Sequence, residues 1–274
     1  MADARPIGVF DSGIGGLTVL HALLERLPQE SYVYLGDTAR VPYGTKGAET
    51  VRRFSLEALR LLESRGVKRV IVACNTASAL GLDAMRAAAQ VPVEGVIEPG
   101  IEAALRQTRG RVGIIGTLGT ISSNAYQVGL RARASELSVF GMACPLFVPL
   151  AEEGWTTGDI PRSIAQRYLH PLIEARVDTV ILGCTHYPLL KATIAEVMGP
   201  RVTLVDSAVV LAEALVQELR EQDALAPATS TPRLSLLVSD VPQRFAELGE
   251  RFLERSLPAV ELVDLENPVV HRSE

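Results

Sequence analysis

The chain has 274 residues, of which 47% are hydrophobic and only 5% are aromatic. This length and composition favour one large or two modest α/β domains with parallel sheets over an all-β sandwich. The net charge of −5 offers no broad basic surface, so we expect no nucleic-acid partner bound through its phosphates.

The three cysteines show no CxxC spacing, and the chain starts without a charged and apolar leader. Both observations argue against a secreted disulfide scaffold. No apolar run approaches the ~20 residues that cross a bilayer. We therefore expect a soluble cytoplasmic protein with reduced thiols and no membrane partner.

Short apolar runs alternate along the chain with segments of helical periodicity. Two such segments, 51–64 and 208–219, carry the apolar spacing of a helix with one buried face. Strands that alternate with helices predict parallel sheets covered by helices. The clearest predicted strands, in chain order, are 7–10, 32–35, 70–73, 112–115, 179–182, 202–205 and 234–238.

Two pairs of segments repeat at nearly the same offset. VIVACNTAS surrounds Cys74 and VILGCTHYP surrounds Cys184, while residues 7–16 and 112–121 share a glycine-containing strand and turn. Each cysteine should lie where a buried strand ends and a helix begins. The repeats predict two pseudo-symmetric α/β domains that face one another across a cleft.

The domain boundaries follow from composition. Residues 93–100 end in Pro99 and Gly100, and residues 223–233 read as a linker. The segment after that linker is too short for a third domain. We expect a discontinuous first domain of residues 1–97 and 207–274, a second domain of residues 98–206, and the active site between them.

The stretch DSGIGG, residues 11–16, follows a strand and opens a helix. Its glycines and the helix N-terminus would suit an anion. It lacks the third glycine of GxGxxG and the Lys-Ser/Thr of a Walker loop, so a nucleotide site is poorly supported. Taken alone, the loop is better explained as a plain strand-to-helix turn that needs glycine.

Polar side chains accompany two of the cysteines. Asn75 and Thr76 follow Cys74, and His186 follows Cys184 by two residues, whereas a structural core position would not gather such neighbours. A helix start favours thiolate over thiol. His186 is better interpreted as a partner of the thiol than as a metal ligand. A zinc site needs three or four ligands at recognisable spacing, and Cys184 with His186 supplies only the first of them.

The loop GDTARVPYG, residues 36–44, ends another predicted strand. Ligands collect at the carboxyl ends of strands in open α/β sheets, so Asp37 and its neighbours should lie beside DSG and CNT. Cys144, before Pro145 in an apolar stretch, is predicted to be structural.

The motifs FDSGIGGL, DTARVPYG, ACNTAS and GCTHYPLL, in this order, resemble those of the glutamate racemases in the cofactor-independent aspartate/glutamate racemase superfamily. The resemblance covers residues 7–206, and the tail fits the family's return to the first domain. It implies an isomerase that interconverts L- and D-glutamate with two cysteines and needs neither cofactor nor metal. It also implies a role in supplying D-glutamate for peptidoglycan, and a homodimer.

In the resembling family the cysteine matching Cys74 acts on D-glutamate and the one matching Cys184 acts on L-glutamate. Asp11 and His186 match residues that set the proton state of the thiols. Supporting positions are Asp37, Thr117 and Glu152. The substrate-binding residues that the resemblance implies are Asp11, Ser12, Pro42, Tyr43, Gly44, Asn75, Thr76, Thr185 and His186.

Three alternatives stay open on the sequence. Related enzymes of this scaffold racemise aspartate, and one methylene is worth only about 1–3 kcal/mol of discrimination. Two mirrored lobes also describe a non-catalytic amino-acid-binding protein, which needs no thiols. A thiol redox protein would cycle Cys74 and Cys184 through a disulfide, but the absence of CxxC disfavours it.

Overall fold

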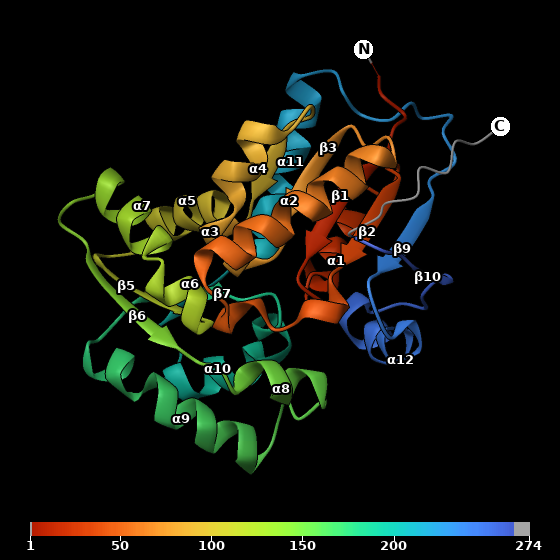
Figure 1. The fold of residues 1–274 in the computed structure, drawn as a ribbon. Helices are drawn as coiled ribbons and strands as arrows, with labels where there is room; N and C mark the ends of the chain where they lie inside the picture. Colours follow the sequence, from red (N-terminus) through yellow and green to blue (C-terminus); the bar gives the residue numbers. More distant parts are fainter. Residues whose placement is uncertain (1, 266–274) are drawn as a thin grey trace.

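The computed structural model describes residues 2–265. Helices and strands alternate along most of this length (Figure 1). The strands are β1 (Ile7–Asp11), β2 (Tyr32–Gly36), β3 (Arg69–Val72), β4 (Val93–Gly95), β5 (Arg111–Gly116), β6 (Ser138–Ala143), β7 (Thr179–Gly183), β8 (Thr203–Asp206), β9 (Leu234–Val238) and β10 (Val260–Leu262). The α-helices are α1 (Leu17–Arg26), α2 (Ala48–Ser64), α3 (Asn75–Leu80), α4 (Leu82–Ala88), α5 (Ile97–Gln107), α6 (Leu118–Ser122), α7 (Ala125–Arg133), α8 (Phe147–Glu152), α9 (Asp159–Glu174), α10 (Lys191–Met198), α11 (Ser207–Glu221) and α12 (Pro242–Leu253). Three 3-10 turns complete the described elements: η1 (Thr38–Arg40), η2 (Tyr43–Thr45) and η3 (Tyr187–Leu190).

The strands form two parallel sheets, as the alternating pattern predicts. Within residues 2–265 the first sheet has the order β10-β9-β2-β1-β3-β4 and the second has the order β6-β5-β7-β8. The segment β2-β1-β3-β4 and the whole second sheet share one topology, because β1 corresponds to β5 and β3 to β7. The predicted two-domain α/β fold is therefore confirmed, and we name the domains after the first and second sheets.

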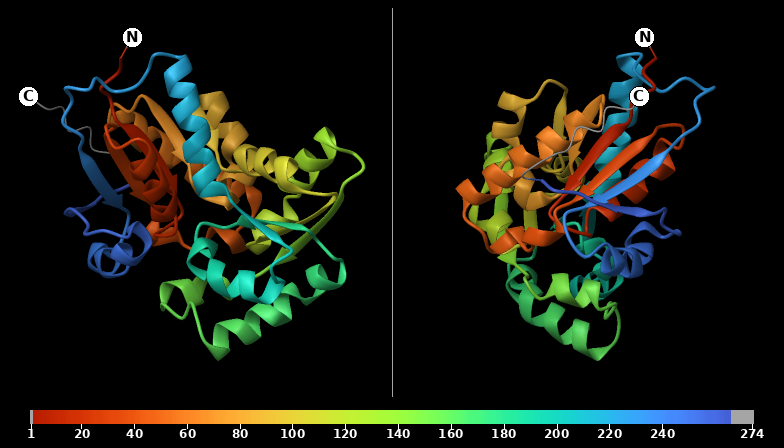
Figure 2. Two further views of the ribbon diagram at one scale, coloured as in Figure 1. Left: turned by 180° about the vertical axis from the view of Figure 1, so that it is seen from behind. Right: turned by 45° about the vertical axis from the view of Figure 1, so that its right-hand side comes forward.

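Helices cover both faces of each sheet (Figures 1 and 2). In the first domain α1, α11 and α12 lie on the face of Val9, and α2 and α4 lie on the face of Phe10. In the second domain α9 and α10 pack on Leu182, while α5 and α7 pack on Ile181. Strands covered on both faces must be apolar throughout, which explains the continuous hydrophobic runs in the sequence.

One apolar core continues from the first domain into the second. It contains Leu20 of α1, Leu211 of α11, and Phe147 and Tyr187 of the second domain. Helix α11 leaves the second sheet after β8 and packs on both α1 and α5 (Figure 2, left). Burying a leucine or phenylalanine side chain stabilises a fold by about 1.5–3 kcal/mol. Hydrophobic packing around α1 and α11 therefore holds the two domains together.

The C-terminal stretch adds β9 and β10 to the free edge of the first sheet, beside β2. Residues 223–233 form the connection to it and contain no helix or strand. Pro99 and Gly100, expected near the domain boundary, lie in the first turn of α5. Residues 266–274 of the proposed first domain lie outside the described residues.

No helix between residues 2 and 265 is long and apolar enough to cross a membrane.

Candidate active site

The carboxyl ends of the central strands of both sheets meet around a small cavity of about 60 Å³. β1, β2 and β3 bring the first-domain loops to it, and β5, β7 and the segment after β6 bring the second-domain residues. This is the edge at which open α/β sheets bind ligands. The cavity is lined by Ser12, Gly13, Ile14, Val41, Pro42, Tyr43, Gly44, Cys74, Asn75, Thr76, Thr117, Val148, Glu152, Cys184, Thr185 and His186.

Cys74 occupies the N-cap position of α3, as the sequence predicts. Its Sγ accepts a hydrogen bond from the N–H of Ala77 at 3.4 Å and donates to Oγ of Ser12 at 3.6 Å. Burial nevertheless raises the pKa of the Cys74 thiol to about 11, and the charge of Asp11 adds to that effect. The helix start and the N–H of Ala77 favour the thiolate, but burial favours the thiol and has the larger effect.

Cys184 follows β7 directly, but no α-helix begins there. The chain passes through the 3-10 segment η3 before α10 starts. Cys184 therefore resembles Cys74 in following a strand, but it does not cap an α-helix as Cys74 does. Burial raises the pKa of the Cys184 thiol, and negative charge on Cys74, Asp11 and Glu152 raises it further. Since a charge on one thiol raises the pKa of the other, the two sulfurs form one electrostatic unit.

His186 joins Cys184 to a carboxylate. Its Nδ1 lies 3.9 Å from Sγ of Cys184, and its Nε2 lies 3.0 Å from Oε1 of Glu152. The hydrogen bond from His186 lowers the pKa of the Glu152 carboxyl, so Glu152 is an acceptor and Nε2 carries a proton. Nδ1 is then the ring atom that faces the thiol.

Asp11 lies behind the cavity wall and not among the residues that line it. Its carboxylate is 1% exposed and accepts from the N–H of Gly13 at 2.9 Å. Burial raises the pKa of Asp11, and its charge raises the pKa of both thiols. Its position supports a role in setting the proton state of the cysteines and does not support direct contact with a substrate.

The glycines of residues 11–16 serve close packing. A Cβ on Gly16 would lie 2.4 Å from Cβ of Asp11, and a Cβ on Gly15 would lie 2.4 Å from Nδ1 of His186. Gly15 belongs to the first domain and His186 to the second, so the missing side chain lets the two domains meet at the site. The turn that needs glycine is therefore the better interpretation of this motif.

The loop of residues 36–44 is braced by Asp37, which lies outside the cavity. Asp37 is fully buried and accepts hydrogen bonds from the Tyr43 hydroxyl, Nε of Arg40 and the hydroxyl of Ser239. The Tyr43 hydroxyl is thus committed to Asp37, while Tyr43 and Gly44 still line the cavity. Asp37 is placed to hold the loop in shape.

Hydroxyl and amide groups connect the domains across the site. Oγ1 of Thr76 lies 2.8 Å from Oγ1 of Thr117, and the Tyr126 hydroxyl donates to Oδ1 of Asn75 at 2.7 Å. Tyr126 was not singled out from the sequence, because a tyrosine in an amphipathic helix carries no sign of a distant partner. The hydrophobic lining residues Ile14, Val41 and Val148 were not predicted either, because an apolar side chain carries no sign in the sequence that it lines a binding site.

Cys144 lies apart from the site in the apolar core. It is fully buried and does not line the cavity. Within residues 2–265 its Sγ makes one hydrogen bond, which it donates to the carbonyl of Met142 at 3.7 Å. Burial raises the pKa of its thiol. Its placement agrees with a structural role.

Nowhere between residues 2 and 265 do three His, Cys, Asp or Glu side chains gather as a metal site would need.

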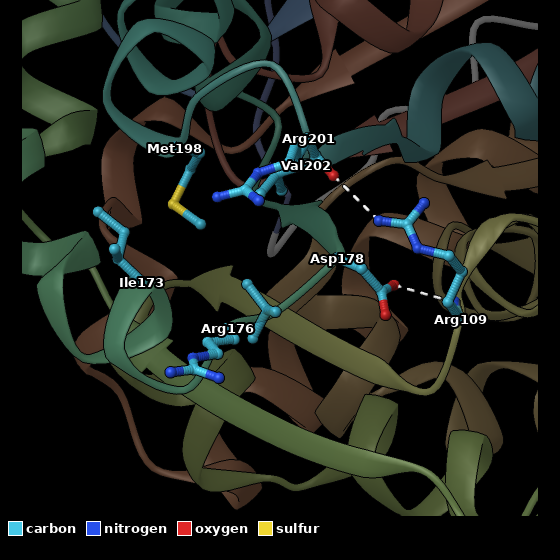
Figure 3. A pocket seen from close by; sticks show the side chains of 8 residues that line it. Arg109, Ile173, Arg176, Asp178, Met198, Arg201 and Val202 are labelled. Carbon is cyan, nitrogen blue, oxygen red and sulfur yellow. Dashed lines mark hydrogen bonds between the residues drawn. The ribbon is translucent and has the colours of Figure 1, made fainter.

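A larger cavity, of about 560 Å³, lies at the opposite edge of the second sheet, among Arg109, Arg176 and Arg201 (Figure 3). Asp178 accepts there from the backbone N–H of Arg109, whose guanidinium donates to the carbonyl of Arg201. The arginines lie where α5, α9 and α10 end, and positive charge at a helix C-terminus counters the helix dipole. We therefore attribute this cluster to the fold.

The fold and the site define a class of protein: a two-domain α/β enzyme with a pair of buried thiols in the cleft between its domains. Comparison with known proteins agrees. The family model for Asp/Glu/Hydantoin racemase matches residues 7–215, and the chain belongs to that family. It is an amino-acid racemase, an isomerase.

The glutamate racemase of Geobacter metallireducens is 52% identical to this chain, over 96% of this chain and 97% of the relative. The structure of the glutamate racemase of Francisella tularensis in complex with D-glutamate matches with a TM-score of 0.91 and 38% identity, covering 96% of this chain and 99% of that chain. The glutamate racemase of Thermus thermophilus in complex with beta-chloro-D-alanine matches with a TM-score of 0.87 and 43% identity, over 97% and 99% of the two chains.

Proposed function

We propose that this racemase interconverts L- and D-glutamate by transferring protons between the α-carbon and two thiols, Cys74 and Cys184. The observation that carries the proposal is that both sulfurs line one cavity from the ends of β3 and β7, the corresponding strands of the two sheets. A substrate between them presents one face of its α-carbon to each thiol. The relatives named glutamate racemase support the choice of glutamate.

Proton removal is the difficult step, because a C–H bond beside a carboxylate is a very weak acid. From L-glutamate, the Cys184 thiolate takes the α-proton on one face, and the Cys74 thiol then gives its proton to the carbanion on the other face. The reverse direction exchanges these roles, so that each turnover leaves the protein with the same number of protons. The assignment of Cys184 to the L enantiomer rests on the resemblance described above.

A thiolate must first form in a site that disfavours it. His186 Nδ1 faces the Cys184 sulfur and is placed to accept its proton, while Glu152 stabilises the imidazolium from the other side. The ammonium group of the substrate adds a positive charge beside the thiols, which lowers their pKa values. Exclusion of water then keeps the thiolate basic next to the α-carbon.

The substrate carboxylates need donors, since negative charge grows on the α-carboxylate as the proton leaves. Ser12, Asn75, Thr76 and Thr185 line the cavity and supply hydroxyl and amide donors. Oδ1 of Asn75 is taken by Tyr126, so the amide N–H groups of Asn75 are the ones free to bind the substrate. We assign substrate binding to these residues together with Gly44 and the Tyr43 backbone.

Substrate entry requires the domains to separate. The cavity of about 60 Å³ is far smaller than the roughly 300–1,000 Å³ of ordinary small-molecule sites. Thr76 and Thr117 meet across it, and Gly44 packs on Thr117 so closely that a Cβ would lie 2.6 Å away. These contacts describe a closed form that opens to bind and release glutamate.

We extend the proposal to the setting of the enzyme on the strength of the family resemblance: a cytoplasmic homodimer that supplies D-glutamate for peptidoglycan. The two sheets support a division into residues 1–97 with 207–274 and residues 98–206, because β9 and β10 join the first sheet.

The proposal is tested by incubating the purified protein with L-glutamate in deuterated water, without added cofactor. We expect the optical signal to decay to zero and deuterium to appear at the α-carbon by NMR. A parallel incubation starts from D-glutamate, and a third uses L-aspartate. Exchange with aspartate but not glutamate assigns the other substrate, and absence of exchange in all three rejects the racemase mechanism.

A further inference from the structure

Helix α12, from the C-terminal part of the first domain, reaches the pair formed by His186 and Glu152 in the second domain. Figure 1 shows α12 beside β9 and β10, at the edge of the first sheet. It packs on α1, and the carbonyl of Leu253 lies 2.9 Å from Nδ1 of His21. The helix is therefore anchored in the first domain while its last turn faces the second.

Arg251 in this last turn binds the end of α8. Its guanidinium donates to the carbonyl of Glu152 at 2.9 Å and lies 3.5 Å from the carbonyl of Ala151. These are carbonyls at a helix C-terminus, which have no partner inside the helix and carry its negative dipole end. A guanidinium from another element thus fixes the residue whose side chain holds His186.

The end of α8 is shaped to receive Arg251. Gly154 has a φ of +75°, its N–H donates to the carbonyl of Ala151, and the N–H of Trp155 donates to that of Leu150. This is a Schellman motif, in which a left-handed glycine closes the helix. A Cβ on Gly154 would lie 2.8 Å from Cζ of Arg251, so glycine also makes room for the guanidinium.

Phe252, the next residue of α12, packs on His186 itself. The two ring centroids are 5.3 Å apart and the planes meet at 81°, and Phe252 is buried. An edge-to-face contact of this kind fixes the plane of the imidazole. The plane decides whether Nδ1 points at Cys184 while Nε2 points at Glu152.

We propose that Arg251 and Phe252 are positioning residues that hold the Glu152–His186 pair in line with Cys184, and so control proton transfer on the Cys184 face only. The proposal rests on the two-thiol function proposed above. The Cys74 thiol makes its hydrogen bonds with other groups, namely Ser12 and the N–H of Ala77. Loss of the α12 contacts should therefore slow one of the two proton transfers and leave the other unchanged.

The rate alone does not reveal which face is affected. L- and D-glutamate have equal free energies in water, so kcat/KM must fall by the same factor in both directions. Isotope effects separate the two faces. If transfer at Cys184 limits the rate, α-deuterated L-glutamate shows a larger primary isotope effect than in the wild type, and α-deuterated D-glutamate shows a smaller one.

The test compares Arg251→Ala and Phe252→Leu with Arg255→Ala, a matched arginine just beyond α12 that pairs with the exposed Glu25. We expect kcat/KM to fall roughly tenfold in the first two variants and to stay at the wild-type value in the third. The ratio of the L to the D isotope effect should rise in the first two variants. Arg251→Lys, which keeps the positive charge and one N–H-bearing nitrogen, should restore part of the rate.

A second comparison uses Glu152→Gln. If Arg251 acts through Glu152, the double variant should be little slower than Glu152→Gln alone. An L-to-D isotope-effect ratio that stays at the wild-type value in a folded Arg251→Ala variant, or additive losses in the double variant, would overturn the proposal and leave Arg251 as a stabilising contact. Failure of the two-thiol function is distinguishable, because Cys74→Ser or Cys184→Ser would then keep full activity.

Discussion

The hydroxyl of Tyr126 donates a hydrogen bond to Oδ1 of Asn75 across the domain interface, at 2.7 Å. Tyr126 is fully buried in α7 of the second domain, and Asn75 is the first residue of α3 in the first. The bond orients the Asn75 amide, so its two N–H donors are the groups left to bind a carboxylate.

Tyr126→Phe should raise KM for glutamate by roughly five- to tenfold, since the amide of Asn75 is then free to rotate. Steady-state racemisation assays measure this. Tyr32→Phe is the matched control, because the Tyr32 hydroxyl is also buried but donates to the carbonyls of Leu23 and Leu27, away from the site. An equal rise of KM in both variants would show that the effect of Tyr126 is general loosening.

Cys74→Ser and Cys184→Ser should each reduce racemisation by about 10²–10⁴-fold, because a hydroxyl is a far poorer proton-transfer group than a thiol. Polarimetry with L- and D-glutamate measures the loss. Full activity in either variant contradicts the two-thiol assignment.

Cys144→Ser provides the control for that series. Cys144 lies in the apolar core and does not line the cavity, so turnover should stay close to the wild-type value while the melting temperature falls. A severe loss of turnover in a folded Cys144→Ser variant would mean that this thiol takes part in the reaction.

Stability should depend on pH through Cys74. Its pKa is raised from 9.0 to about 11 in the folded protein, so the folded state favours the protonated thiol. The raised pKa contributes about 2–3 kcal/mol to the free energy of unfolding. This contribution is fully present below about pH 9, where the thiol is protonated in both states, and it is lost as the pH rises through about 11. Urea unfolding of the wild type and Cys74→Ala should show a difference in unfolding free energy that shrinks over this interval. A difference that stays constant would place the pKa of this thiol at its ordinary value.

The buried ion pair between Lys68 and Glu30 should dominate the stability of the tail connection. The two side chains are 3% and 0% exposed and meet at 2.7 Å, and Glu30 also accepts from the N–H of Ala226. Lys68→Met leaves a buried carboxylate without its partner, at a cost of roughly 3–5 kcal/mol.

Urea denaturation checks this expectation, with Arg5→Ala as the control. Arg5 pairs with Asp3 at the surface, where an ion pair contributes about 0–1 kcal/mol. Similar losses in the two variants would show that water reaches the Lys68–Glu30 pair.

The predicted strands came from continuous apolar runs, and each of them lies in an observed strand within one residue at either end. β4, β6 and β10 were not expected. β4 and β10 are only three residues long, and β6 is a half-buried edge strand that contains Gly141. None of the three therefore shows the continuous apolar run that is typical of a strand covered by helices on both faces. The repeat around the two cysteines predicted that both would lie at one cleft, because equivalent strands of a duplicated fold end at the same edge.

By itself the sequence determined the α/β class, the two mirrored domains and the placement of Cys74 and Cys184 at one cleft, since apolar periodicity and repeated motifs are local properties of the chain. Only the tertiary structure decided the direction in which the pKa values of the thiols shift, because burial depends on every element around them. It alone placed Asp11 and Asp37 outside the cavity, and it brought Tyr126 to Asn75, Arg251 to Glu152 and Phe252 to His186, partners far away in sequence. Such contacts form when whole domains pack, and no spacing along the chain records them.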